Sequence, residues 1–201
     1  MSSPQAPSRE IELKLACDPA ALPDLLAHPA LPRNWRSARL AATYFDTPGA
    51  DLRRANLSLR LRREGRRRVQ TLKAGQGATG GLFDRAEWES VPKGPAPDIA
   101  ALADTPLAES LESGATLAPC FDVVVLRRSH TLADGETLID IAVDEGEIRA
   151  GGRRLPVCEI ELELRRGSPA ALFALARDLA ESVPLTVSGF SKSERGYRLL
   201  A

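Results

Sequence analysis

Four segments of the sequence alternate charged or polar residues with aliphatic or aromatic ones, with a period of two. The segment EIELKL at 10–15 places two glutamates and a lysine on one face of a strand and three aliphatic residues on the other. LSLRLRR at 57–63 repeats the pattern with arginines, RAEWE at 85–89 with mixed charges, and EIELEL at 159–164 with glutamates alone. This alternation predicts half-buried strands of an antiparallel sheet.

The sign of the charges differs from one strand to the next. Two strands carry mostly carboxylates and one carries arginines, and long rows of like charge on an open sheet would repel cross-strand neighbours. If a sheet of about eight strands closes into a barrel, all these charged faces line one lumen. We therefore interpret the segments as walls of a closed barrel, and an open sheet with one solvated face is the alternative.

The rest of the chain completes a mainly β member of the α+β class. Asp18-Pro19 and Ser168-Pro169 are typical helix starts, and the Pro- and Ala-rich stretch 93–113 predicts loop and short helix. Further strands are expected at 43–47, 68–74, 83–91, 121–132, 136–146 and 158–166, with a short piece around 147–152 after a glycine-containing turn. We expect a disordered tail at 1–8 and one domain at 9–201, an eight-stranded antiparallel closed barrel with flanking helices.

The bulk composition limits the class of partner. The 27 basic and 27 acidic residues cancel, so no overall field attracts nucleic acid or membrane, and neither is expected as a partner. No apolar run approaches the roughly 20 residues needed to span a bilayer, and the N-terminus lacks the features of a secretion signal. Three cysteines lie far apart, as in reduced cytosolic proteins. We expect a cytoplasmic protein.

The two kinds of charge suggest a ligand. Clustered carboxylates either take up protons or hold a cation, and oxygen-only ligands favour Mg²⁺, Mn²⁺ or Ca²⁺ over zinc. Arginines carry permanent charge and forked donors that match phosphate oxygens. The combination indicates a metal-polyphosphate site. The GxGxxG pattern at 75–80 follows a strand but opens no helix, so we interpret it as a hairpin loop.

The ordered motifs resemble a known family. EIELK matches an ExExK signature, and the further motifs, in order, are YFDT, LSLRLRR, VQTLKAG, GGLFDRAEWE, DEGEI, EIELEL and SKSERGY. Together they cover residues from about 10 to 199 and resemble the CYTH domain, or triphosphate tunnel metalloenzymes, in the branch of bacterial inorganic triphosphatases. The resemblance implies an eight-stranded antiparallel tunnel that holds a triphosphate.

The resemblance also implies roles for individual residues. Glu10 and Glu12 would belong to the metal and catalytic cluster, and Lys14 would act in catalysis by reaching a phosphate. The basic residues expected to bind substrate are Lys14, Arg60, Arg62, Lys73, Arg85, Arg127, Lys192 and Arg195, with Arg128 as the alternative to Arg127. Glu159, Glu161 and Glu163 would complete the metal site. Glu87, Glu89 and Asp144 are expected in the lumen without a separate role.

By the same resemblance, the expected activity is hydrolysis of tripolyphosphate to pyrophosphate and phosphate with Mg²⁺ or Mn²⁺, at one or two metal sites. Thiamine triphosphate, nucleoside triphosphates and ATP cyclisation remain alternatives, as does a non-catalytic polyphosphate-binding module. Many relatives of this branch continue into a helical CHAD domain, which the 201-residue sequence does not contain. The sequence therefore fits either a stand-alone tunnel or an excised domain.

Overall fold

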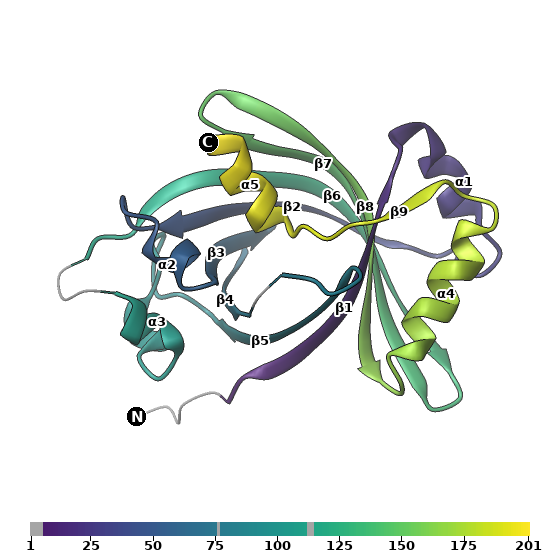
Figure 1. Ribbon diagram of the computed structural model, residues 1–201, viewed down its shortest axis with the longest axis horizontal. Coiled ribbons are helices and arrows are strands. Elements are labelled where there is room, and N and C mark those ends of the chain that lie inside the picture. Colours follow the sequence, from purple (N-terminus) through teal and green to yellow (C-terminus); the bar gives the residue numbers. More distant parts are fainter. Residues whose placement is uncertain (1–5, 76, 112–114) are drawn as a thin grey trace.

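Eight antiparallel strands close into a barrel, as the alternating segments predict, and a ninth short strand extends the sheet (Figure 1). The structure, a computed structural model, describes residues 6–75, 77–111 and 115–201. The strand order is β5-β4-β3-β2-β6-β7-β8-β1-β9, and an additional pairing of β5 with β1 closes the barrel. The strands are β1 Ser8–Cys17, β2 Arg36–Asp46, β3 Leu57–Glu64, β4 Arg67–Ala74, β5 Leu82–Ser90, β6 Ala118–Asp134, β7 Thr137–Ala150, β8 Arg153–Arg166 and β9 Leu185–Val187.

Strand β1 makes the closure because different parts of it pair with different neighbours. Its first half pairs with β5, from Ser8 opposite Glu87 to Leu13 opposite Leu82. Its second half pairs with β8, and its last residues also pair with β9. The charged face of β1 therefore borders two other charged strands.

The helices are short and lie mostly outside the sheet. They are η1 Pro19–Ala21, α1 Leu22–Ala27, α2 Asp51–Arg54, η2 Ile99–Leu102, α3 Pro106–Ser110, α4 Ala170–Ala180 and α5 Lys192–Leu200. Asp18 caps η1 as predicted, because its carboxylate accepts from the Ala20 N–H. Among the described residues, no helix has both the length and the apolar character needed to cross a membrane.

The aliphatic faces of the strands form the core, outside the lumen. Leu13 and Leu15 of β1 and Ile160 of β8 pack in one buried cluster with residues of α1 and α4. Trp88 packs away from the lumen with Leu102 of η2, as its alternation with two glutamates predicts. The period-two pattern thus sends apolar side chains outward and charged ones inward.

Helix α5 is held against the barrel near the lumen. A capping box starts the helix, in which Ser191 and Glu194 each satisfy the backbone N–H of the other. A Cβ at Gly196 would lie 2.2 Å from the Phe121 ring, so only glycine allows this approach to β6. The Tyr197 hydroxyl donates to buried Asp46 at the end of β2, at 2.6 Å. These contacts place the first turn of α5 beside the lumen.

Several predicted boundaries are wrong. The strands expected from 43 and from 158 begin earlier, at Arg36 and Arg153. The sequence suggests a turn at Gly146, followed by a separate short strand, but β7 runs unbroken from Thr137 to Ala150. A Cβ at Gly146 would lie 2.1 Å from the Val124 carbonyl oxygen, so the glycine permits close approach of β7 to β6 rather than a turn. The expected tail at 1–8 falls mostly outside the described residues, and β1 begins at Ser8.

Candidate active site in the barrel lumen

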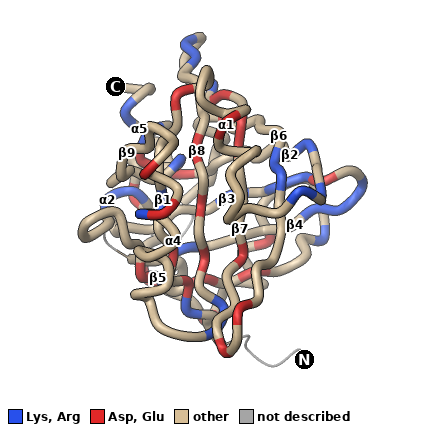
Figure 2. The backbone as a smooth tube through the Cα atoms, turned by 90° about the vertical axis from the view of Figure 1, so that its right-hand side faces the viewer, with Lys and Arg blue, Asp and Glu red and all other residues tan. Residues whose placement is uncertain are grey.

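The barrel lumen contains a cavity of about 330 Å³. Thirteen of the predicted site residues line it, namely Glu10, Glu12, Lys14, Arg60, Arg62, Lys73, Arg85, Glu87, Glu89, Arg127, Glu161, Glu163 and Lys192. Of the other three, Asp144 and Glu159 form ion pairs with members of this set, and Arg195 pairs with Glu159. Figure 2 shows acidic residues alternating with uncharged ones along β8, which is the pattern that aims them inward. The structure thus brings all the predicted charged residues together.

One end of the lumen is a dense network around Lys192, the first residue of α5. Its ammonium lies 2.6 Å from Asp144 and 2.8 Å from Glu161, and it also bonds Glu159. Burial alone would lower the pKa of Lys192, but these three carboxylates raise it above its usual value. Lys192 is therefore a permanently charged, buried cation.

The cations of this network favour the ionised form of Glu161, one of its carboxylates. Burial would raise the pKa of Glu161, but Lys14, Lys192 and Arg127 hold it well below its usual range. Arg127 bonds both Asp144 and Glu161, each at 2.6 Å. Arg128 turns away from the lumen and pairs with Glu145 at 3.1 Å, so the structure places Arg127 and not Arg128 in the site.

A second group of carboxylates lies next to this network, and Lys14 joins the two groups because it pairs with both Glu12 and Glu161. Glu10 pairs with Lys73 at 2.5 Å and Arg85 at 2.9 Å, and although burial opposes ionisation these cations lower the pKa of Glu10 to about 2. Glu12 and Glu163 face each other across β1 and β8. Burial raises the pKa of both carboxyl groups, that of Glu163 to about 7, and neighbouring carboxylates add to the effect.

Strand β3 presents cations that lack close partners. Arg62 lies 3.7 Å from Glu89, and burial together with Arg60 and Arg127 lowers the pKa of its guanidinium. The buried Nε of Arg60 has no hydrogen-bond acceptor among the described residues. An anion in the lumen would supply an acceptor for the Arg60 Nε–H. It would also offset the repulsion between Arg62 and the neighbouring cations.

Two groups of carboxylates differ in their fitness for a metal. Asp144, Glu159 and Glu161 each place an oxygen within 4.8 Å of the others, but the Lys192 ammonium already bonds all three. Glu12 pairs with Lys14 and Arg85, and Glu163 pairs with Arg165. Burial nevertheless raises the pKa of both carboxyl groups, so their charged forms are disfavoured without a further cation. A set of carboxylate oxygens fits Mg²⁺ or Mn²⁺ rather than a softer metal.

Several lumen residues were not predicted from the sequence. They are Ala6, Ser8, Tyr44, Arg165, Ser191 and Ser193, together with Ser58, which shares a strand face with the predicted arginines. Arg165 continues the alternation two residues after Glu163, so the same periodicity could have identified it, and it pairs with Glu163 at 3.0 Å. No periodicity signals Ser191 or Ser193, because they reach the lumen through the docking of α5.

The structure defines this protein as a closed antiparallel β-barrel with both acidic and basic side chains around one lumen. The chain belongs to the CYTH domain family, whose profile matches residues 8–197. An inorganic triphosphatase of Haemophilus influenzae is 33% identical over 195 residues, which are 95% of this chain and 55% of that protein. The chain thus spans about half the length of that curated relative.

Solved structures show the same fold at lower sequence identity. A candidate adenylyl cyclase from Hippeastrum, described as having a dominant triphosphatase activity, aligns with a TM-score of 0.69 and 21% identity over 96% of this chain and 97% of that one. The PH1819 protein of Pyrococcus horikoshii aligns with a TM-score of 0.61 and 18% identity over 94% of this chain and 98% of that one. These likenesses establish the tunnel fold.

Proposed function

We propose that this protein is a divalent-metal-dependent triphosphatase that hydrolyses inorganic tripolyphosphate to pyrophosphate and phosphate inside the lumen. The observation that carries the proposal is that underpartnered arginines on β3 and buried carboxylates on β1 and β8 line one cavity. Such a pair of surfaces fits an anion and a cation bound together. The identity to an inorganic triphosphatase supports the same activity.

The basic residues would hold the phosphate chain and neutralise its charge. Phosphoryl transfer depends mainly on positioning and on electrostatic stabilisation, and it needs no covalent nucleophile here. Arg60 and Arg62 offer donors along β3, and Arg127 extends the cationic surface from β6. Lys73 and Arg85 would exchange part of their contact with Glu10 for phosphate oxygens. The remaining predicted ligands of the chain are Lys14, Lys192 and Arg195.

The metal would lie at Glu12 and Glu163, with Glu10 close by. Burial raises the pKa of Glu12 and Glu163, and a divalent cation beside them would favour their charged forms. Lys192 already pairs with Glu159 and Glu161. Bound Mg²⁺ or Mn²⁺ would supply charge neutralisation and polarisation of the phosphate oxygens. Deprotonated Glu163 would be needed for this binding, since a protonated carboxyl is a poor ligand.

The lining of the cavity of about 330 Å³ favours an inorganic chain over a nucleotide, whereas a neighbouring cavity that shares Glu163 with it also includes Leu40 and Ile141. Apart from Ala6, every described residue that lines the cavity is charged or carries a hydroxyl group. Binding sites for organic ligands are lined mainly by apolar and aromatic side chains. A base or a thiamine ring would therefore find little complementary surface in this cavity.

The test compares tripolyphosphate, ATP and thiamine triphosphate in parallel, each with Mg²⁺, with Mn²⁺ and with EDTA, and measures phosphate and pyrophosphate release. We expect metal-dependent cleavage of tripolyphosphate in preference to the other two. Preferred cleavage of ATP or thiamine triphosphate would refute the substrate assignment. Binding of tripolyphosphate without cleavage would refute catalysis and identify a binding module.

Two pairs of variants test the site itself. Arg127→Gln should lower kcat/KM for tripolyphosphate by about 100-fold, because a preorganised charged donor is lost. Arg128→Gln, its neighbour outside the lumen, is the matched control and should change the value by less than about twofold. Glu12→Gln should abolish metal-dependent turnover, with Glu145→Gln as the exposed control. Equal rates within either pair would contradict the assignment of the lumen.

A further inference from the structure

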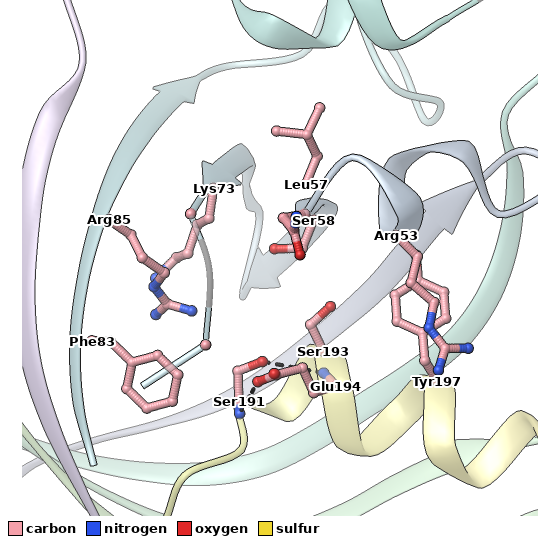
Figure 3. Close-up of a pocket in the computed structure, with 13 residues that line it drawn as sticks. Arg53, Leu57, Ser58, Lys73, Phe83, Arg85, Ser191, Ser193, Glu194 and Tyr197 are labelled. Atoms are coloured by element: carbon pink, nitrogen blue, oxygen red, sulfur yellow. Dashed lines mark hydrogen bonds between the residues drawn. The ribbon is translucent and has the colours of Figure 1, made fainter. Parts of the chain in front are cut away.

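A smaller cavity of about 80 Å³ opens beside the lumen, between α2, the start of β3 and the start of α5 (Figure 3). It shares Lys73 and Arg85 with the lumen, together with the hydroxyl-bearing residues Ser58, Ser191 and Ser193. In Figure 3, Ser58 and Ser193 face the space between Arg85 on one side and Arg53 on the other. The main cavity thus continues into a side cavity.

Three cations line the side cavity, of which Lys73 and Arg85 also pair with Glu10. Arg53, Lys73 and Arg85 line it, and the carboxylate among its lining residues is that of Glu194, which is committed to the Ser191 N–H at 2.7 Å. Arg54 pairs with Asp51, whereas Arg53 lies over the Tyr197 ring, 5.0 Å from its centroid, with no carboxylate of the described chain within salt-bridge distance. Arg53 is therefore a cation available to a ligand.

Arg85 adds a second available donor, from a buried position. Its side chain is 9% exposed, and two carboxylates accept from its terminal nitrogen. Its buried Nε–H has no acceptor among the described residues. A buried donor without an acceptor costs free energy, and a phosphate oxygen in the side cavity would supply the acceptor.

The wall that carries Arg53 is fixed in place. Asp46 accepts from the backbone N–H groups of Leu52 and Arg53, at 2.9 and 3.1 Å, and from the Tyr197 hydroxyl. One buried carboxylate therefore joins α2 to α5. The Arg53 backbone and the ring beneath its guanidinium are positioned before any ligand arrives, which lowers the entropic cost of binding.

The size of the cavity selects the ligand. One water needs roughly 10–15 Å³ of such space, so the cavity has room for about five to eight water-sized positions. A phosphate group, with five heavy atoms, fits this space, and a nucleoside does not. We propose that the side cavity binds one phosphate group, with Arg53 as a ligand. The group is either orthophosphate or the end of a polyphosphate chain longer than three units, and this inference rests on the proposed function for its ligand class.

The first test measures orthophosphate binding by calorimetry, without turnover, in the wild type and in Arg53→Gln, Arg53→Lys and Arg54→Gln. We expect Arg53→Gln to raise the dissociation constant about tenfold, as for loss of one charged hydrogen bond. Arg53→Lys should recover most of the affinity because it keeps the charge. Arg54→Gln, the neighbour with its own carboxylate partner, should differ from the wild type by less than about twofold. Thermal unfolding of each variant checks that α2 and α5 remain docked.

The second test separates the two sources of phosphate. The KM values for linear tripolyphosphate and tetrapolyphosphate are compared in the same four proteins. An effect of Arg53→Gln on orthophosphate alone identifies the free ion, and a selective rise in the KM for tetrapolyphosphate identifies the chain end. If Arg53→Gln matches Arg54→Gln in both tests, the side cavity is not a phosphate site. If the wild type cleaves no polyphosphate, the proposed function fails, and the orthophosphate titration still decides this inference.

Discussion

Replacing Lys192 by methionine should destabilise the protein strongly, because its ammonium lies among three buried carboxylates. The Lys192 side chain is 8% exposed, Asp144 and Glu159 are fully buried, and Glu161 is nearly so. Methionine keeps most of the length and packing of the side chain but removes the charge. Removing one partner of a buried ion pair costs about 3–5 kcal/mol, because the remaining charge is left uncompensated.

The loss should depend on pH with a defined sign. In the wild type, Lys192 and Arg127 hold the pKa of Asp144 below its usual value against the opposing effect of burial, so this contribution to stability is present above about pH 4 and lost at lower pH. In Lys192→Met the carboxyl groups would take up protons more readily, which relieves their repulsion. The difference between the two proteins should therefore be largest near pH 8 and shrink towards pH 4.

Urea unfolding at pH 8 and pH 5, followed by circular dichroism, measures the effect. For a chain of this size, about 3–5 kcal/mol corresponds to a fall in melting temperature of roughly 10 °C. Lys93→Met is the matched control, because the Lys93 side chain is 86% exposed and its ammonium lies as far as 4.0 Å from the Asp98 carboxylate. Loss of this exposed ion pair should cost less than about 1 kcal/mol. Mg²⁺ should restore part of the stability of Lys192→Met, since the freed carboxylate oxygens lie within 4.8 Å of one another. A variant as stable as the control at pH 8 would refute the reasoning.

Two further substitutions test other features of the barrel. Burial raises the pKa of Glu163 to about 7 from 4.5, so the folded state disfavours its charge and the wild type loses stability as pH rises between these values. Without metal, Glu163→Gln should be about 3 kcal/mol more stable than the wild type at pH 8 and equal to it at pH 4 in urea unfolding, and a pH-independent difference would count against this. Gly146→Ala should cost about 3 kcal/mol, because its Cβ would lie 2.1 Å from the Val124 carbonyl oxygen. Gly94→Ala, with nothing within 4 Å of its added Cβ, is the control, and equal unfolding midpoints would contradict the close contact.

The sequence predicts the barrel wall well because strand periodicity is a local property. Each residue of EIELKL takes its face from the position of its neighbours, so the inward direction of Glu10 and Glu12 follows without knowledge of the partner strands. Closure follows from the segregation of sign, which an open sheet would not tolerate. The structure confirms both predictions.

Contacts between distant segments are not encoded in this way. The glycine in DEGEI has the same local signature whether it serves a turn or a close approach between strands, and Gly146 serves the second. Strand β9 has only three residues, too few for a periodic signal. The helix at Lys192 reaches the lumen because Gly196 fits against Phe121, and such a fit appears only when both elements are in place.

The ion pairs of the lumen also indicate that binding of a triphosphate would replace existing contacts between carboxylates and cations. Glu10 already bonds Lys73 and Arg85, which are two of the residues proposed to hold phosphate. In the absence of ligand, the carboxylate occupies the position that phosphate oxygens would take on these cations. If Glu10 joined Glu12 and Glu163 in holding a metal, it would release both cations for the substrate. Metal and triphosphate should therefore bind cooperatively. The metal would pair with the Glu10 carboxylate, and the triphosphate would pair with the Lys73 and Arg85 cations that Glu10 releases.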